Sequence, residues 1–174
     1  MYYIEKTYDI EYAHRIFNQE KTKYNQECKC RSLHGHSGKV KVVIQSEKLY
    51  QAGMVIDFSD LKPIKEFVEM FDHSLILSRE DPMVANLFIG GINIWETPYI
   101  KVMEKVDMFD NRVILLDNND CSSEVIANIM FENIRKILDN IRSELGFTLR
   151  PIYVKQVEFS ETNNNKIVVT NDNI

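Results

Sequence analysis

Three of the four histidines in this chain are spaced so that they could bind one metal ion. His34 and His36 are two residues apart, so on a strand both side chains point to the same face. His14 lies on the apolar face of an earlier alternating run. If the two runs pair antiparallel, the three imidazoles meet at one end of a sheet. Three neutral imidazoles with an open fourth position are typical of a catalytic zinc site, although imidazole also suits iron, nickel and copper.

Two cysteines lie just upstream of this histidine pair. Cys28 and Cys30 belong to a short segment with basic neighbours that leads directly into His34. A thiol in such a place can act as a general base or as a nucleophile. The alternative is a structural zinc site made of both thiols with His34 and His36, although no second Cys-x-Cys or Cys-x-x-Cys pair completes four thiol ligands.

Two carboxylates add further candidates for proton transfer and binding. Asp72 directly precedes His73, and an aspartate can orient a neighbouring imidazole or share a proton with it. The alternative is a solvent-facing pair at a helix end. Glu161 ends a strand-like run on the parity of its buried residues, where a carboxylate is costly unless it is paired. It could accept two parallel hydrogen bonds from a guanidine-like edge, or it could simply reach water.

The elements that must position these side chains follow from hydrophobic periodicity. Alternation predicts strands and 3.6-residue spacing predicts helices. The strands are predicted at residues 2–14, around Val40–Ile44, at 152–162 and at 166–170, and the helices at 57–71 and about 122–145. The order is β-β-α-α-β-β, and the less regular residues 78–118 are interpreted as an elaboration of the same domain.

Composition limits the remaining classes of protein. The chain has 174 residues, 44% hydrophobic and 27% charged, which predicts one globular domain spanning residues 1–174 with an insertion at about 78–118. A formal charge of −5 argues against a nucleic-acid partner. No apolar run approaches the roughly 18 residues that span a bilayer, and the N-terminus is too charged for a signal peptide. We therefore expect a soluble, cytoplasmic protein with no membrane partner.

Together these segments make the chain resemble the 6-pyruvoyltetrahydropterin synthase family, which includes bacterial 6-carboxytetrahydropterin synthase. The resemblance covers most of the chain outside residues 78–118, and the segment from the cysteine to His-Gly-His, with Gly-Met-Val-Ile-Asp-Phe, is its most specific part. The matching segments are, in chain order, Tyr12-Ala13-His14, Cys30-Arg31-Ser32-Leu33-His34-Gly35-His36, Gly53-Met54-Val55-Ile56-Asp57-Phe58, Asp72-His73, Ser122-Ser123-Glu124 and Glu161-Thr162.

The resemblance implies an α+β tunnelling fold (T-fold). This fold is a four-stranded antiparallel sheet with two helices on one face, in the order β-β-α-α-β-β. Oligomerisation completes a barrel: three subunits close it, and two trimers usually stack into a homohexamer. The resemblance also implies a zinc ion held by His14, His34 and His36.

The resemblance further implies a site between subunits. Its catalytic residues would be Cys30, Asp72 and His73, and its substrate-binding residues Glu161, Ser122 and Ser123. Glu161 would anchor the 2-amino-pyrimidinone edge of a pterin. The implied substrate is 7,8-dihydroneopterin triphosphate. One family reaction gives 6-pyruvoyltetrahydropterin by loss of triphosphate, and another gives 6-carboxytetrahydropterin, acetaldehyde and triphosphate for queuosine and other 7-deazaguanine pathways.

Cysteine spacing distinguishes these two branches of the family. Three residues separate Cys30 from His34, as in the carboxy-forming enzymes, whereas five separate Cys28 from His34, as in the pyruvoyl-forming enzymes. The context around Cys30 favours the carboxy-forming branch. Glu27 lies too far from His34 to favour a third branch that uses a glutamate. A non-catalytic pterin-binding protein of the same fold is a further alternative, since the inserted segment is long and Cys121 replaces a usual proline.

Overall fold

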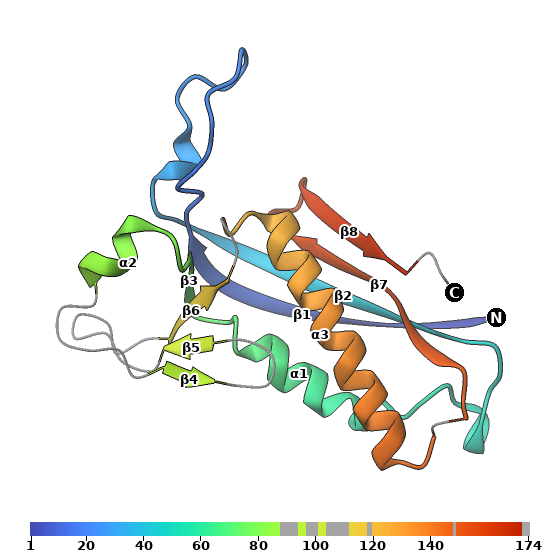
Figure 1. Ribbon diagram of the computed structural model, residues 1–174. Coiled ribbons are helices and arrows are strands. Elements are labelled where there is room, and N and C mark those ends of the chain that lie inside the picture. Colours follow the sequence, from blue (N-terminus) through green and yellow to red (C-terminus); the bar gives the residue numbers. More distant parts are fainter. Residues whose placement is uncertain (88–93, 97–100, 104–111, 118–119, 148, 172–174) are drawn as a thin grey trace.

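The described part of the chain forms one curved sheet with helices packed against it (Figure 1). The structure is a computed structural model that describes residues 1–87, 94–96, 101–103, 112–117, 120–147 and 149–171. The sheet has eight strands in these residues, in the order β4-β5-β6-β3-β1-β2-β7-β8.

The centre of the sheet is the antiparallel core that the sequence predicts. β1 and β2 pair along their whole length, which places His14 opposite His34. β7 then pairs with β2, and β8 pairs with β7, both antiparallel. These four strands are β1 (Tyr2–His14), β2 (His34–Ser46), β7 (Ile152–Ser160) and β8 (Lys166–Thr170).

Two helices cover one face of this core, as predicted (Figure 1). α3 (Ser123–Glu144) has the expected bounds and packs on β7 and β8. α1 (Lys62–Glu69) is shorter than predicted, because the preceding Phe58–Leu61 form a separate 3₁₀ turn. The Asp57 side chain caps that turn by accepting from the Ser59 N–H at 2.7 Å.

β3 and the described strands of the inserted region, β4 to β6, lengthen the sheet beyond the four strands expected. β3 runs parallel to the end of β1, β6 runs parallel to β3, and β5 and β4 follow antiparallel. Each has only three to five residues, which is too short for alternation to predict a strand. The elements are β3 (Ser74–Ser78), α2 (Pro82–Leu87), β4 (Ile94–Glu96), β5 (Lys101–Met103) and β6 (Arg112–Leu116), and the rest of 78–118 lies outside the described residues.

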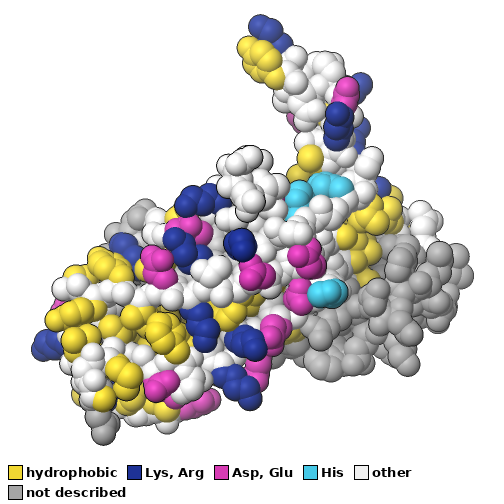
Figure 2. Space-filling model, turned by 180° about the vertical axis from the view of Figure 1, so that it is seen from behind, with side chains coloured by type: hydrophobic (Ala, Val, Ile, Leu, Met, Phe, Trp, Pro, Cys, Tyr) yellow, Lys and Arg dark blue, Asp and Glu magenta, His cyan; other side chains and the backbone are white. Residues whose placement is uncertain are grey.

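The two faces of the sheet differ in chemistry. The face under α1 and α3 holds the main apolar core, in which Phe71 and Phe159 are among the largest fully buried side chains. The opposite face of the central strands carries many charged side chains (Figure 2). Cross-strand ion pairs form there, with Lys41 Nζ 2.7 Å from Glu158 Oε1 and Lys39 Nζ 2.6 Å from Asp9 Oδ1. None of the described helices is long and apolar enough to cross a membrane.

Candidate active site

The three histidines of the predicted metal site converge where β1 ends and β2 begins. One ring nitrogen from each of His14, His34 and His36 lies within 4.8 Å of those of the other two. The ring centroids are 4.7–5.2 Å apart. His14 is fully buried, and the other two are partly exposed. The group could therefore hold a metal ion that stays accessible from one side.

Hydrogen bonds at Nδ1 orient two of these imidazoles, His14 and His34, for metal binding. His14 Nδ1 lies 2.8 Å from the Cys121 carbonyl oxygen, and His34 Nδ1 lies 2.8 Å from the Ser32 carbonyl oxygen. Because a carbonyl only accepts, each Nδ1 carries the proton and each Nε2 has a free lone pair. Nε2 of His14 and of His36 is buried without a hydrogen-bond partner among the described residues. Together with the free Nε2 of His34, these two orphaned nitrogens fit a metal ion with three nitrogen ligands.

Burial keeps two of these imidazoles neutral. Desolvation lowers the pKa of His14 and of His36, and the nearby Glu161 carboxylate only partly opposes the shift. The hydrogen bond from His14 to the Cys121 carbonyl also opposes it. The neutral imidazole is the form that binds a metal, so the site favours metal binding over protonation.

Glu161 lies beside the histidine cluster, directly after β7. Its Oε1 is 3.7 Å from His14 Nε2 and 3.9 Å from His36 Nε2. Ser123, in the first turn of α3, donates a hydrogen bond to the same oxygen. Two residues expected to contact a pterin are thus brought together. Ser122 is the N-cap residue of α3, partly exposed, and its side chain makes no capping hydrogen bond.

Tyr12 belongs to one of the matching sequence segments, but the sequence did not predict a role for its side chain in the site. Its ring centroid lies 5.4 Å from that of His14, 5.5 Å from that of His36 and 5.6 Å from that of Phe159. Its hydroxyl is buried without a hydrogen-bond partner in the described part of the chain. The signal available in the sequence was its parity with His14 on β1, which places both side chains on one face.

The two thiols upstream of His34 differ in accessibility. Cys30 is partly exposed in the 3₁₀ turn Lys29–Arg31, and its carbonyl accepts from the Ile16 N–H at 2.7 Å. Cys28 is only 3% exposed, and its Sγ lies 4.0 Å from the Asn25 carbonyl oxygen. Within the described residues, the candidate metal group contains the three histidines and neither thiol. This arrangement disfavours the structural cysteine–histidine site.

Asp72 and His73 form a hydrogen-bonded pair between α1 and β3. Asp72 Oδ2 lies 2.8 Å from His73 Nδ1, and Asp72 Oδ1 accepts from the Glu11 N–H at 2.8 Å. The hydrogen bond from the Glu11 N–H lowers the pKa of Asp72, and the hydrogen bond with His73 lowers it further. The carboxylate therefore stays ionised. His73 is 80% exposed at its side chain and lines a cavity of about 520 Å³ with His36 and Ser37. The structure thus brings His73 to the same cavity as a candidate metal ligand, but not into the metal cluster.

The sheet and the three-histidine group agree with the T-fold and the metal site expected from the sequence, and comparison with known proteins identifies the family. The family profile described as 6-pyruvoyl tetrahydropterin synthase matches residues 3–172. The chain belongs to this family.

Several relatives are carboxy-forming enzymes by name. The chain is 37% identical over 93 residues to the 6-carboxy-5,6,7,8-tetrahydropterin synthase of Aquifex aeolicus. This match covers 48% of this chain and 57% of that protein, so it spans less than two thirds of the relative's length. It is 38% identical over 119 residues to the enzyme of the same name from Haemophilus influenzae, covering 63% and 79%. A putative 6-carboxy-5,6,7,8-tetrahydropterin synthase from Pyrococcus horikoshii is 32% identical over 139 residues, covering 72% and 81%.

Solved structures confirm the fold. An uncharacterized protein from Wolinella succinogenes is 29% identical with a TM-score of 0.78, covering 98% of both chains. The 6-pyruvoyl tetrahydropterin synthase of Caenorhabditis elegans is 20% identical with a TM-score of 0.60, covering 98% of this chain and 96% of that one. The predicted T-fold is therefore confirmed for the single chain.

Proposed function

We propose that this protein is a zinc-dependent 6-carboxytetrahydropterin synthase. It would convert 7,8-dihydroneopterin triphosphate to 6-carboxy-5,6,7,8-tetrahydropterin, acetaldehyde and triphosphate, as in queuosine and 7-deazaguanine biosynthesis. The observation that carries the proposal is the convergence of three histidines, two with orphaned Nε2 atoms, beside the Glu161 carboxylate. The names of the bacterial relatives support the carboxy-forming reaction.

In this proposal His14, His34 and His36 hold the metal ion, and Glu161 holds the pterin. A zinc ion bound there would act as a Lewis acid toward the side-chain hydroxyls of the substrate. The two oxygens of Glu161 can accept two N–H groups from the 2-amino-pyrimidinone edge. Ser123 restrains one of these oxygens by its hydrogen bond, and Ser122 would line the same pocket.

Proton transfer would fall to Cys30 and to the Asp72–His73 pair. The partly exposed Cys30 would, in its thiolate form, take a proton from a carbon or hydroxyl of the substrate. Asp72 accepts a hydrogen bond from His73 Nδ1, which leaves His73 Nε2 free to receive a proton. The Asp72 carboxylate would then stabilise the resulting imidazolium. The exposed position of His73 suits a site completed by a neighbouring subunit.

We propose a homotrimer or a hexamer built from two trimers. β8 is the last strand of the described sheet, and β1 pairs with β3 only through Tyr12–His14 among the described strands. Most of the β1 edge and the β8 edge are thus available for pairing with other copies, which is what barrel closure requires. We also propose a single domain, since the described strands of the insertion continue the same sheet. A cytoplasmic location is part of the proposal, because three free cysteines are typical of a reducing compartment.

A second candidate function is the pyruvoyl-forming reaction on the same substrate. The observation that favours it is Cys28, which lies in the same loop as Cys30 at the spacing of that branch. Burial of Cys28 argues for Cys30 as the reacting thiol. A non-catalytic pterin-binding role would require tight pterin binding with no product.

Product analysis tests the proposal. Zinc-loaded protein would be mixed with 7,8-dihydroneopterin triphosphate, and the products identified by mass spectrometry. We expect 6-carboxytetrahydropterin with acetaldehyde, lost in Cys30→Ala and retained in Cys28→Ala. 6-Pyruvoyltetrahydropterin as the final product, with the opposite pattern in the two variants, would assign the protein to the second candidate. Absence of turnover in zinc-loaded protein would refute both lyase functions.

A further inference from the structure

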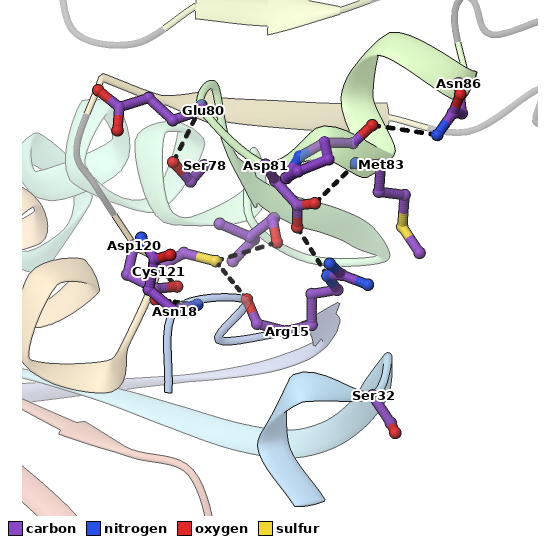
Figure 3. Close-up of polar contacts among 12 residues, drawn as sticks. Arg15, Asn18, Ser32, Ser78, Glu80, Asp81, Met83, Asn86, Asp120 and Cys121 are labelled. Atoms are coloured by element: carbon purple, nitrogen blue, oxygen red, sulfur yellow. Dashed lines mark hydrogen bonds and ion pairs between the residues drawn. The ribbon is translucent and has the colours of Figure 1, made fainter. Parts of the chain in front are cut away.

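The inserted region contacts the metal site through the residue that follows His14. Arg15 Nε donates to Asp81 Oδ2 at 2.7 Å (Figure 3). Asp81 lies in the short segment between β3 and α2, and its side chain is fully buried. A buried carboxylate is destabilising unless it is paired, so the ion pair ties this loop to the end of β1.

Asp81 is also held by the start of α2. Its Oδ1 accepts from the Met83 N–H at 2.8 Å, and its backbone carbonyl accepts from the Val84 N–H at 2.9 Å. Its own N–H donates to the Ser78 carbonyl at the end of β3, at 3.1 Å. Asp81 is therefore held by three hydrogen bonds to backbone groups, one of them to its carboxylate, and it can serve as a rigid anchor for Arg15.

Cys121 completes the connection from Arg15 to His14. Its Sγ points at the Arg15 carbonyl oxygen, 3.0 Å away, and lies 3.5 Å from the Ile76 carbonyl oxygen of β3 (Figure 3). The thiol is the donor in both contacts, because a carbonyl oxygen only accepts. The backbone carbonyl oxygen of Cys121 accepts a hydrogen bond from His14 Nδ1, and the two atoms are 2.8 Å apart.

The backbone of Cys121 is fixed from a second direction. Its N–H donates to Asp120 Oδ1 at 2.9 Å, and Asp120 Oδ2 accepts from the Asn18 N–H at 3.0 Å. The carbonyl that orients His14 therefore depends on contacts with both ends of the inserted region and with the segment after β1.

We propose that Asp81 and Cys121 are positioning residues for the metal ligand His14, so that the inserted region acts on the metal centre. The proposal rests on the metal site of the proposed function. Asp81 fixes Arg15, the Arg15 carbonyl fixes Cys121, and the Cys121 carbonyl sets the tautomer and orientation of the His14 ring. Loss of such an outer partner of a metal ligand typically weakens metal binding about 10- to 100-fold.

The test is the zinc dissociation constant of the full chain, measured by competition with a chromophoric chelator. Asp81→Asn keeps the shape and the helix-capping acceptor but removes the charge that pairs with Arg15. Asp117→Asn is the control, because it removes the charge of another Arg–Asp pair in the same region, Arg79 Nε to Asp117 Oδ1 at 2.6 Å, whose side chains are 39% and 60% exposed. We expect an increase of about 10- to 100-fold for Asp81→Asn and less than about 3-fold for Asp117→Asn.

A second pair of variants guards against a simple folding defect. Cys121→Ala removes the thiol donor, whereas Cys121→Ser restores a donor in the same place. We expect weaker zinc binding in the alanine variant and recovery in the serine variant, with far-ultraviolet circular dichroism unchanged in both. Equal zinc affinity in wild type, Asp81→Asn and Cys121→Ala would overturn this inference alone. A wild-type protein that binds no zinc would overturn the proposed function as well.

Discussion

Substitution of Gly38 by alanine tests the packing that supports the site. Gly38 lies on β2, and an added Cβ would be 3.0 Å from the Ser160 carbonyl oxygen and 3.0 Å from Tyr12 Cε1. Ser160 is the last residue of β7, just before Glu161, and Tyr12 packs on two of the candidate metal ligands. The tyrosine ring can lie across β2 because glycine leaves that space empty.

The magnitude follows from these distances. An ordinary contact begins near 3.4 Å, so both neighbours must move by 3.4 − 3.0, or about 0.4 Å. One neighbour is a backbone oxygen in the strand ladder, which cannot rotate away. Overpacking of this kind costs about 1–3 kcal/mol, and the entropy advantage of alanine over glycine offsets about 0.5–1 kcal/mol. We expect Gly38→Ala to lower the free energy of unfolding by about 1–2 kcal/mol, and Tm by about 2–4 °C for each kcal/mol.

The assay is urea unfolding of the metal-free protein at fixed protein concentration, because the stability of the proposed oligomer would depend on protein concentration. Gly35→Ala is the matched control on the same strand, since among the described residues its Cβ would meet only the Tyr12 carbonyl oxygen, at 3.3 Å. We expect little change in that variant. If both variants unfold like wild type, the proposed packing of Tyr12 over Gly38 is wrong.

Three further predictions concern the site itself. His14→Ala should weaken zinc binding by more than the roughly 100-fold expected from loss of an outer partner, whereas unchanged affinity in a chelator titration would favour a cysteine–histidine site. Tyr12→Phe removes a buried hydroxyl that has no partner in the described residues, so the metal-free protein should gain about 1 kcal/mol of stability in urea unfolding while pterin affinity falls. Tyr8→Phe removes a similarly orphaned hydroxyl away from the histidine cluster and should leave pterin affinity unchanged; equal loss in both would remove Tyr12 from the site. Burial holds the pKa of His14 below its unfolded value of 6.5. The contribution of His14 to the stability of the metal-free protein should therefore be present above about pH 6.5 and lost as the pH falls through the folded pKa. A urea midpoint that stays constant from pH 7.5 to 5 would contradict this.

Much of the fold could be predicted because its central elements have strong local patterns. β1 and β2 alternate clearly, and their antiparallel pairing follows from their order, which was enough to bring His14 to His34. α3 has a long apolar stripe, and its bounds were predicted within a residue. The contact between Ser123 and Glu161 also follows once the start of α3 and the end of β7 are placed.

The features that the sequence did not predict depend on contacts distant in the chain. β3 and β6 pair in parallel across more than thirty intervening residues, and short buried strands leave no periodicity to detect. The ion pair of Arg15 with Asp81 and the approach of the Cys121 carbonyl to His14 depend on that same pairing. The orphaned hydroxyl of Tyr12 could not be recognised until the neighbours of its ring were known.

The most direct test of the account is X-ray absorption at the zinc edge on protein loaded with one equivalent of zinc per chain. The account predicts three imidazole nitrogens at about 2.0–2.1 Å with one light oxygen or nitrogen ligand and no sulfur, and it predicts loss of one imidazole in His14→Ala. Sulfur scattering at about 2.3 Å would place Cys28 or Cys30 on the metal and contradict a zinc centre built from the three histidines.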